Sequence, residues 1–227
     1  MSGVQQIDNA DRTLSRPISG LEFLLGAAIV LGHNVWHILP NEVPILFVLG
    51  LVSTRLREGG WAALGLKRPK SWPKTILLAV GAAILRLLLG SLVIDPLTAR
   101  FWPEQVAPKG TGSIVHSPIA ALIALLFVWT FAAFGEEIGY RGYLTKRCAD
   151  MGGGSRIGWW AATIVVAVLF GYGHYYKGPA GILDSSVAGL ILGATFLLSG
   201  RNLWTTILAH GFIDTTAVVL VFLGLAS

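Results

Sequence analysis

Residues 119–141, IAALIALLFVWTFAAFGEEIGYR, place two adjacent acids and an arginine directly after a long apolar run. The run from Ile119 to Phe134 is as apolar as a membrane span. A charged side chain near the centre of a bilayer costs about 2.5–3.5 kcal/mol on insertion scales, so charges in such places indicate function. The stretch therefore predicts a transmembrane helix whose Glu136, Glu137 and Arg141 are candidate functional residues.

Composition extends this interpretation to the whole chain. Hydrophobic residues make up 54% of the 227 residues and charged residues only 13%, whereas soluble domains carry about 25% charged residues. Such a chain cannot cover a water-facing surface, so we expect an all-α, polytopic bundle of transmembrane helices. The net charge of +5 is assigned to cytoplasmic loops, where basic residues collect, and we expect no nucleic-acid partner.

The apolar stretches predict about seven spans. They cover residues 21–39, 44–56, 75–94, 118 onward, 157–174, 180–198 and 203–223. The second is the weakest prediction, because it is barely long enough to cross a hydrocarbon core of about 30 Å. Residues 1–18 are polar and are expected to form a cytoplasmic tail rather than a signal peptide, which would begin with basic residues and an apolar core.

Basic residues concentrate in alternate loops. These loops contain Arg55, Arg57, Lys67, Arg68, Lys70 and Lys74, then Arg141, Lys146, Arg147 and Arg156, and finally Arg201. The positive-inside rule then places the N-terminus in the cytoplasm, and we expect a bacterial inner (plasma) membrane protein. Residues 19–115 are interpreted as N-terminal transmembrane helices with a basic interfacial loop, followed by a second region over residues 116–227.

The paired acids are expected to have different roles. Glu137 and Arg141 are four residues apart and share a helix face, where they can neutralise each other. Glu136 is rotated by about 100° from Glu137 on an α-helix, so it lacks this partner and remains available for chemistry. The alternative interpretation is an interfacial acid–base cluster at the end of a span.

Two histidines complete the candidate site. His174 ends the fifth apolar stretch, and His210 lies four residues before Asp214 in the seventh. A single histidine in a span is more often a hydrogen-bond partner between helices, but both histidines together with Glu136 favour catalysis. Since His210 lies close to the basic Arg201 loop, we expect the site to be displaced toward the cytoplasm and to receive water from that side.

Three motifs stand in series along the second half of the chain. They are Glu136-Glu137-Ile-Gly-Tyr-Arg141, Phe170-Gly-Tyr-Gly-His174 and His210-Gly-Phe-Ile-Asp214. They resemble the Glu-Glu-x-x-x-Arg, Phe-x-x-x-His and His-x-x-x-Asn/Asp motifs of the CPBP family (CAAX protease and bacteriocin-processing, also called Abi or CAAX-type) of intramembrane proteases. The resemblance covers about residues 119–219 and identifies 116–227 as a CPBP-type catalytic transmembrane core.

The resemblance implies a glutamate-type endopeptidase that hydrolyses a peptide bond in a membrane-associated protein or peptide, prenylated or leader-bearing. It implies that Glu136 and His174 activate a water molecule and that His210 and Asp214 stabilise the oxyanion. The supporting residues that it implies are Glu137, Arg141 and Phe170. An ionised Asp214 cannot donate a hydrogen bond as asparagine can, so we expect Asp214 to orient His210, which remains the donor.

Other functions stay open at this stage. The chain could be a non-catalytic immunity or scaffold protein of the same family. No cofactor is expected, but a metal-dependent protease could use Glu136, His174 and His210 as zinc ligands. His33 and His37 form a second pair of possible metal ligands. A transporter is less favoured because the sequence lacks an internal repeat.

Rival protease classes have little support in the sequence. The zinc motif His-Glu-x-x-His, the serine motif Gly-x-Ser-Gly and the aspartate motif Gly-x-Gly-Asp are all absent. Cys148 is the only cysteine, which excludes an internal disulfide, and its basic surroundings make it a weak candidate nucleophile. The expected partners are therefore membrane lipid and a protein or peptide substrate.

Overall fold

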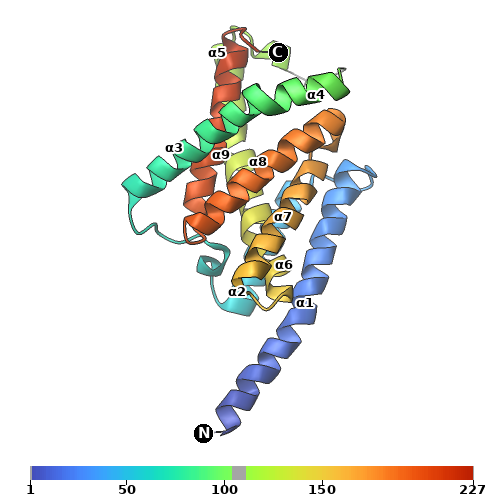
Figure 1. Ribbon diagram of the computed structural model, residues 1–227, viewed down its shortest axis with the longest axis vertical. Helices are drawn as coiled ribbons and strands as arrows, with labels where there is room; N and C mark the ends of the chain where they lie inside the picture. The colour runs from blue at the N-terminus through green and yellow to red at the C-terminus, as the bar shows by residue number, and fades with distance from the viewer. Residues whose placement is uncertain (1, 104–110, 227) are drawn as a thin grey trace.

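The computed structural model describes residues 2–103 and 111–226, with side chains described from residue 15 onward except at 111. This part of the chain is helical, contains no strand and forms a polytopic bundle (Figure 1). The α-helices are α1 (Ser2–Asn34), α2 (Glu42–Glu58), α3 (Trp72–Leu89), α4 (Asp95–Phe101), α5 (Pro118–Phe127), α6 (Thr145–Met151), α7 (Arg156–Tyr172), α8 (Gly178–Leu198) and α9 (Leu203–Phe222). Short 3-10 turns cover Trp61–Leu64, Thr111–Ser113 and Tyr175–Lys177.

Five helical segments of the described chain are long and apolar enough to cross a membrane. They are Ser15–Asn34, Trp72–Phe101, Pro118–Met151, Tyr175–Leu198 and Leu203–Phe222. Helix α7 is apolar but shorter, with 17 residues. All seven stretches predicted from the sequence overlap a helix, although the first was expected to reach Leu39 and its helix ends at Asn34. The third continues past Ile94 through a π turn over Gly90–Ile94 into α4.

The helix with the paired acids is continuous but not uniformly α-helical. Its middle, the segment η4 (Val128–Leu144), is π-helical, and the following Thr145 N–H donates to the carbonyl of Tyr140, five residues earlier. Wide turns of this kind are rare and occur frequently at functional sites. Here the wide turns carry Glu136, Glu137 and Arg141 into the interior of the bundle.

Helices α7 and α8 pack closely through small residues. A Cβ added at Gly189 of α8 would lie 3.0 Å from the Cα of Ala167, and one at Gly193 would lie 2.6 Å from the Thr163 side chain. Small residues allow membrane helices to approach at short backbone distances. This contact fixes α7 against α8, and His174 lies two residues after Tyr172, the last residue of α7.

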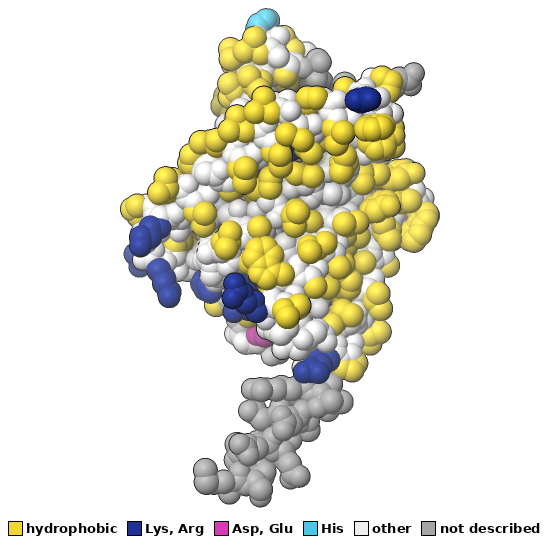
Figure 2. Space-filling model, viewed as in Figure 1, with side chains coloured by type: hydrophobic (Ala, Val, Ile, Leu, Met, Phe, Trp, Pro, Cys, Tyr) yellow, Lys and Arg dark blue, Asp and Glu magenta, His cyan; other side chains and the backbone are white. Residues whose placement is uncertain are grey.

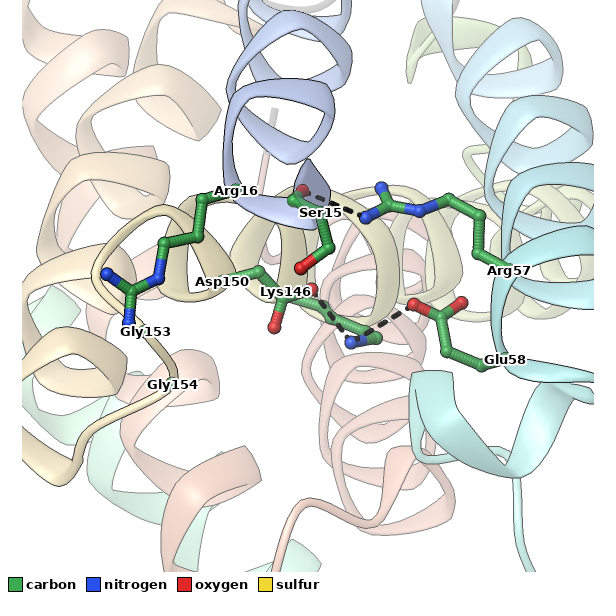
Figure 3. Close-up of a pocket in the computed structure, with 8 residues that line it drawn as sticks. All are labelled: Ser15, Arg16, Arg57, Glu58, Lys146, Asp150, Gly153 and Gly154. Atoms are coloured by element: carbon green, nitrogen blue, oxygen red, sulfur yellow. Dashed lines mark hydrogen bonds and ion pairs between the residues drawn. The ribbon is translucent and has the colours of Figure 1, made fainter. Parts of the chain in front are cut away.

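One end of the bundle is held by ion pairs around the buried Arg147. Arg147 is fully buried and binds both Glu22 of α1 and Glu58 of α2, while Arg57 binds Glu22 at 2.6 Å. A neighbouring pocket of about 400 Å³ opens at the same end. Figure 3 shows Lys146 between Glu58 and Asp150 in this pocket, with distances of 3.4 and 2.8 Å. These contacts tie α1, α2 and α6 together.

The surface has the two zones that a membrane protein needs. Apolar side chains cover most of the face in Figure 2, and Lys and Arg gather in the lower part of the view near the start of α3. Many of the exposed residues on the spans are large and apolar, among them Leu21, Leu77, Ile119, Leu122 and Leu198. This distribution, together with the five apolar helical segments, is that of an integral membrane protein.

Candidate active site

Glu137 is held by two partners in the interior. Its Oε1 lies 2.9 Å from Nη1 of Arg141, as the four-residue spacing predicts. The same oxygen lies 2.8 Å from Nδ1 of His210 on α9. Glu137 and Arg141 are 0% and 2% exposed. A carboxylate this deeply buried needs such partners, because an isolated charge in a low dielectric is strongly disfavoured.

His210 lies between two carboxylates. Besides the contact of Nδ1 with Glu137, its Nε2 lies 3.5 Å from Oδ2 of Asp214. The expected juxtaposition of His210 and Asp214 is therefore present, while the link to Glu137 was not anticipated. These contacts fix the imidazole ring from both sides, with Nε2 on the side of Asp214.

Glu136 differs from its neighbour in having no fixed partner. Its Oε2 is buried and has no hydrogen-bond partner among the described residues. The side chain lines a cavity of about 270 Å³. A buried polar oxygen without a partner inside a cavity is the arrangement in which a carboxylate can accept a proton from a bound water molecule.

His174 lies in the turn between α7 and α8 rather than within a span. Its Nδ1 lies 3.0 Å from the carbonyl oxygen of Phe170, which leaves Nε2 for other contacts. The Phe170 ring packs against the His174 ring at 4.8 Å between centroids and lies 4.2 Å from Cζ of Arg141. Phe170 therefore connects the turn to the ion pair of Glu137.

The cavity brings the predicted site residues together. It is lined by Arg86, Ala132, Glu136, Phe170, His174, Tyr176, Lys177, Asp184, Ser185, Ala188, Leu192, His210, Ile213 and Asp214. Glu137 and Arg141 are packed behind this lining. Tyr176 and Lys177 lie beyond the end of α7 that is opposite to the Gly152–Gly154 turn. His174 thus lies at the end of α7 away from that turn, whereas His210 lies seven residues after the start of α9, near Arg201. The expected displacement of the site toward the cytoplasm stays a prediction.

Two charged cavity residues were missed in the sequence. Arg86 of α3 forms an ion pair with Asp184 of α8, and both line the cavity. Each stands inside an apolar stretch, so the cost of a charge in a membrane could have identified them. The sequence analysis also missed Glu42, which is 5% exposed at the start of α2.

The surroundings of the candidate metal ligands differ between the two hypothetical metal sites. Among the described residues, no three His, Cys, Asp or Glu side chains are grouped so that they could hold a metal ion. Of the proposed zinc ligands, His210 already contacts Glu137 and Asp214 through its two ring nitrogens. In the second pair, His33 contacts the carbonyl of Leu39 and the carboxylate of Glu42 instead of sharing a site with His37.

Comparisons with known proteins agree with the motifs. Residues 118–216 match the family described as type II CAAX prenyl endopeptidase Rce1-like. Neither the curated proteins nor the solved structures contain a match to this chain. The matched segment includes all three motifs and most of the cavity lining. Over residues 118–216 the chain therefore matches the CAAX-protease (CPBP) family of membrane proteases, the family that the three motifs resemble.

Proposed function

We propose that this protein is a glutamate-dependent intramembrane endopeptidase. The observation that carries the proposal is the contrast between adjacent acids: Glu137 is held by Arg141 and His210 and does not line the cavity, whereas Glu136 lines the cavity and its buried Oε2 has no hydrogen-bond partner among the described residues. A general base needs a free carboxylate within reach of a water molecule. The match over residues 118–216 to the family described as type II CAAX prenyl endopeptidase Rce1-like supports peptide-bond hydrolysis.

The proposed mechanism assigns each side chain one step. Glu136 accepts a proton from water, assisted by His174, as the oxygen attacks the carbonyl carbon of the scissile bond. His210 donates a hydrogen bond to the oxyanion that forms, and Asp214 orients it. The proton then passes to the leaving amine. No metal is required for these steps.

The substrate class follows from the setting of the site. The cavity is formed within a bundle of apolar helices, so the substrate is a membrane-associated protein or peptide. A prenylated C-terminus or a hydrophobic leader would supply the apolar anchor. We also propose that all seven apolar helical segments, including α2 and α7, cross the membrane, with the N-terminus in the cytoplasm.

The proposal is tested by Glu136→Gln, which keeps volume and hydrogen bonding but removes the base. Membrane proteomes of cells with the wild-type and Glu136→Gln proteins are compared for one protein whose cleaved form disappears. With that protein as substrate, the purified variant should be about 10²–10⁴-fold slower and equally stable to heat in detergent. Undiminished cleavage by Glu136→Gln would reject the proposed mechanism.

A further inference from the structure

Glu42 is a buried acid that the proposed mechanism does not use. It is the first residue of α2, and Asn41 caps this helix by accepting from the N–H of Val43. Its Oε1 accepts a hydrogen bond from the hydroxyl of Tyr140 at 3.1 Å. Its Oε2 has no hydrogen-bond partner among the described residues, and Nε2 of His33 lies 3.6 Å away. Burying such a group is costly, so its position requires an explanation.

Tyr140 connects this acid to the candidate site. It is 1% exposed and lies four residues after Glu136 on the same helix. Its ring meets the Phe170 ring edge-on at 5.0 Å. The ring nitrogen Nδ1 of His174 contacts the backbone carbonyl oxygen of Phe170. Tyr140 thus touches the residue that orients His174.

The hydroxyl of Tyr140 also supports the turn directly. A Cβ built on Gly173 would lie 2.7 Å from the Tyr140 oxygen and 3.6 Å from Oε1 of Glu42. The backbone of Gly173 is helical (φ −59°), so the short distance, and not a special conformation, favours glycine there. His174 is the next residue, and it is the one proposed catalytic side chain outside a helix.

We propose that Glu42 and Tyr140 are positioning residues that hold the Gly173–His174 turn in its working geometry. This inference rests on the proposed function, since it concerns the placement of His174. Helix α2 thereby supplies the site with a carboxylate from outside the matched segment 118–216. The hydrogen bond between Glu42 and Tyr140 holds the tyrosine hydroxyl against Gly173. The Phe170 ring packs against the imidazole of His174.

The test measures how accessible the His174 side chain is and does not require a cleavage assay. Purified protein in detergent is treated with diethyl pyrocarbonate, and the modification rate of each histidine is followed by mass spectrometry. His37 and His116 are exposed and serve as internal references, and buried His210 reports whether the fold is intact. Tyr140→Phe should raise the rate at His174 alone by about fivefold, as expected when one buried hydrogen bond is lost.

Three further variants identify the contact. Glu42→Ala should match Tyr140→Phe, whereas Glu42→Gln should retain the wild-type rate, because an amide oxygen still accepts from the hydroxyl. Gly173→Ala should also raise the His174 rate. Its combination with Tyr140→Phe should react no faster than either change alone, because both disrupt the same contact.

An unchanged His174 rate in Tyr140→Phe and Gly173→Ala, or a Glu42→Gln rate equal to that of Glu42→Ala, would overturn the inference. If Tyr140→Phe also raises the modification rate of His210, the fold of that variant is disturbed. The His174 rate of Gly173→Ala then decides whether the inference holds. A farnesylated CAAX peptide is used in parallel: Tyr140→Phe should lower kcat about fivefold and leave KM unchanged. Failure of the wild-type protein to cleave any such peptide would reject a prenylated substrate as part of the proposed function, while the modification pattern would still decide the placement of His174.

Discussion

At the scale of residues, the sequence predicted local pairs but not contacts between distant helices. The ion pair between Glu137 and Arg141 followed from a four-residue spacing, and so did the proximity of His210 to Asp214. The contact between Glu137 and His210 joins residues 73 positions apart. No helical periodicity relates two such positions, because their distance depends on how separate helices pack.

The buried ion pair leads to a prediction about stability. Arg141→Ala removes one partner of Glu137 and the cation above the Phe170 ring. Breaking a buried pair typically costs about 3–5 kcal/mol, so the variant should melt earlier in detergent. The matched control is Arg156→Ala, since Arg156 is exposed and its loss should leave melting unchanged. Equal melting of Arg141→Ala and wild type would show that the pair contributes little.

The donor geometry predicts that activity does not require a metal. If a zinc ion were held by Glu136, His174 and His210, each carboxylate left near the cavity would already have a partner. Glu137 contacts Arg141 and His210, Asp214 contacts His210, and Asp184 contacts Arg86. Catalytic zinc sites normally use a separate carboxylate to accept the proton. We expect cleavage at an undiminished rate after exhaustive chelation, measured on purified protein whose metal content is determined in parallel. If chelation abolished activity and added zinc restored it, Glu136, His174 and His210 would be zinc ligands instead.

At the scale of elements, apolar length predicted where helices occur better than where they end. The sequence located all seven apolar stretches, but α1 ends at Asn34 and the third helix continues to Phe101. The π-helical segment Val128–Leu144 could not be predicted, because it depends on packing around its wide turns. Glu42 was missed for a related reason: the short connection after α1 brings the start of α2 into the interior.

The close contact of α7 and α8 predicts a cost for any larger side chain at Gly189. The helices meet with Ala167 against Gly189 and Thr163 against Gly193. Gly189→Leu must push them apart, and overpacking of this kind costs about 1–3 kcal/mol. We expect a lower melting temperature and reduced cleavage, since His174 lies at the end of α7. Gly81→Leu is the control, because a side chain at Gly81 meets no atom within 4 Å. An unchanged melting temperature of Gly189→Leu would mean that α7 and α8 can move apart without loss of stability.

At the scale of the whole molecule, charge divides the bundle into two ends. One end holds the cluster around Arg147 and the basic loops before α3 and after α6. The opposite end holds the turn of His174, Tyr176 and Lys177 beside the cavity. Sequence composition predicted this polarity, because basic residues are excluded from apolar spans and collect on the cytoplasmic side.

Orientation therefore bears on which substrates can reach the site. If the basic end is cytoplasmic, the His174 turn lies toward the far side, and a leader-bearing peptide that crosses the membrane is favoured over a prenylated cytoplasmic protein. Single cysteines at Ser71, in the basic loop, and at Gly112, at the other end, are introduced into a Cys148→Ser background. An impermeant maleimide added to intact cells should label the Gly112→Cys protein and should label Ser71→Cys only after permeabilisation. The reverse pattern would invert the topology and bring the cavity to the cytoplasm, where a prenylated substrate would become the better candidate.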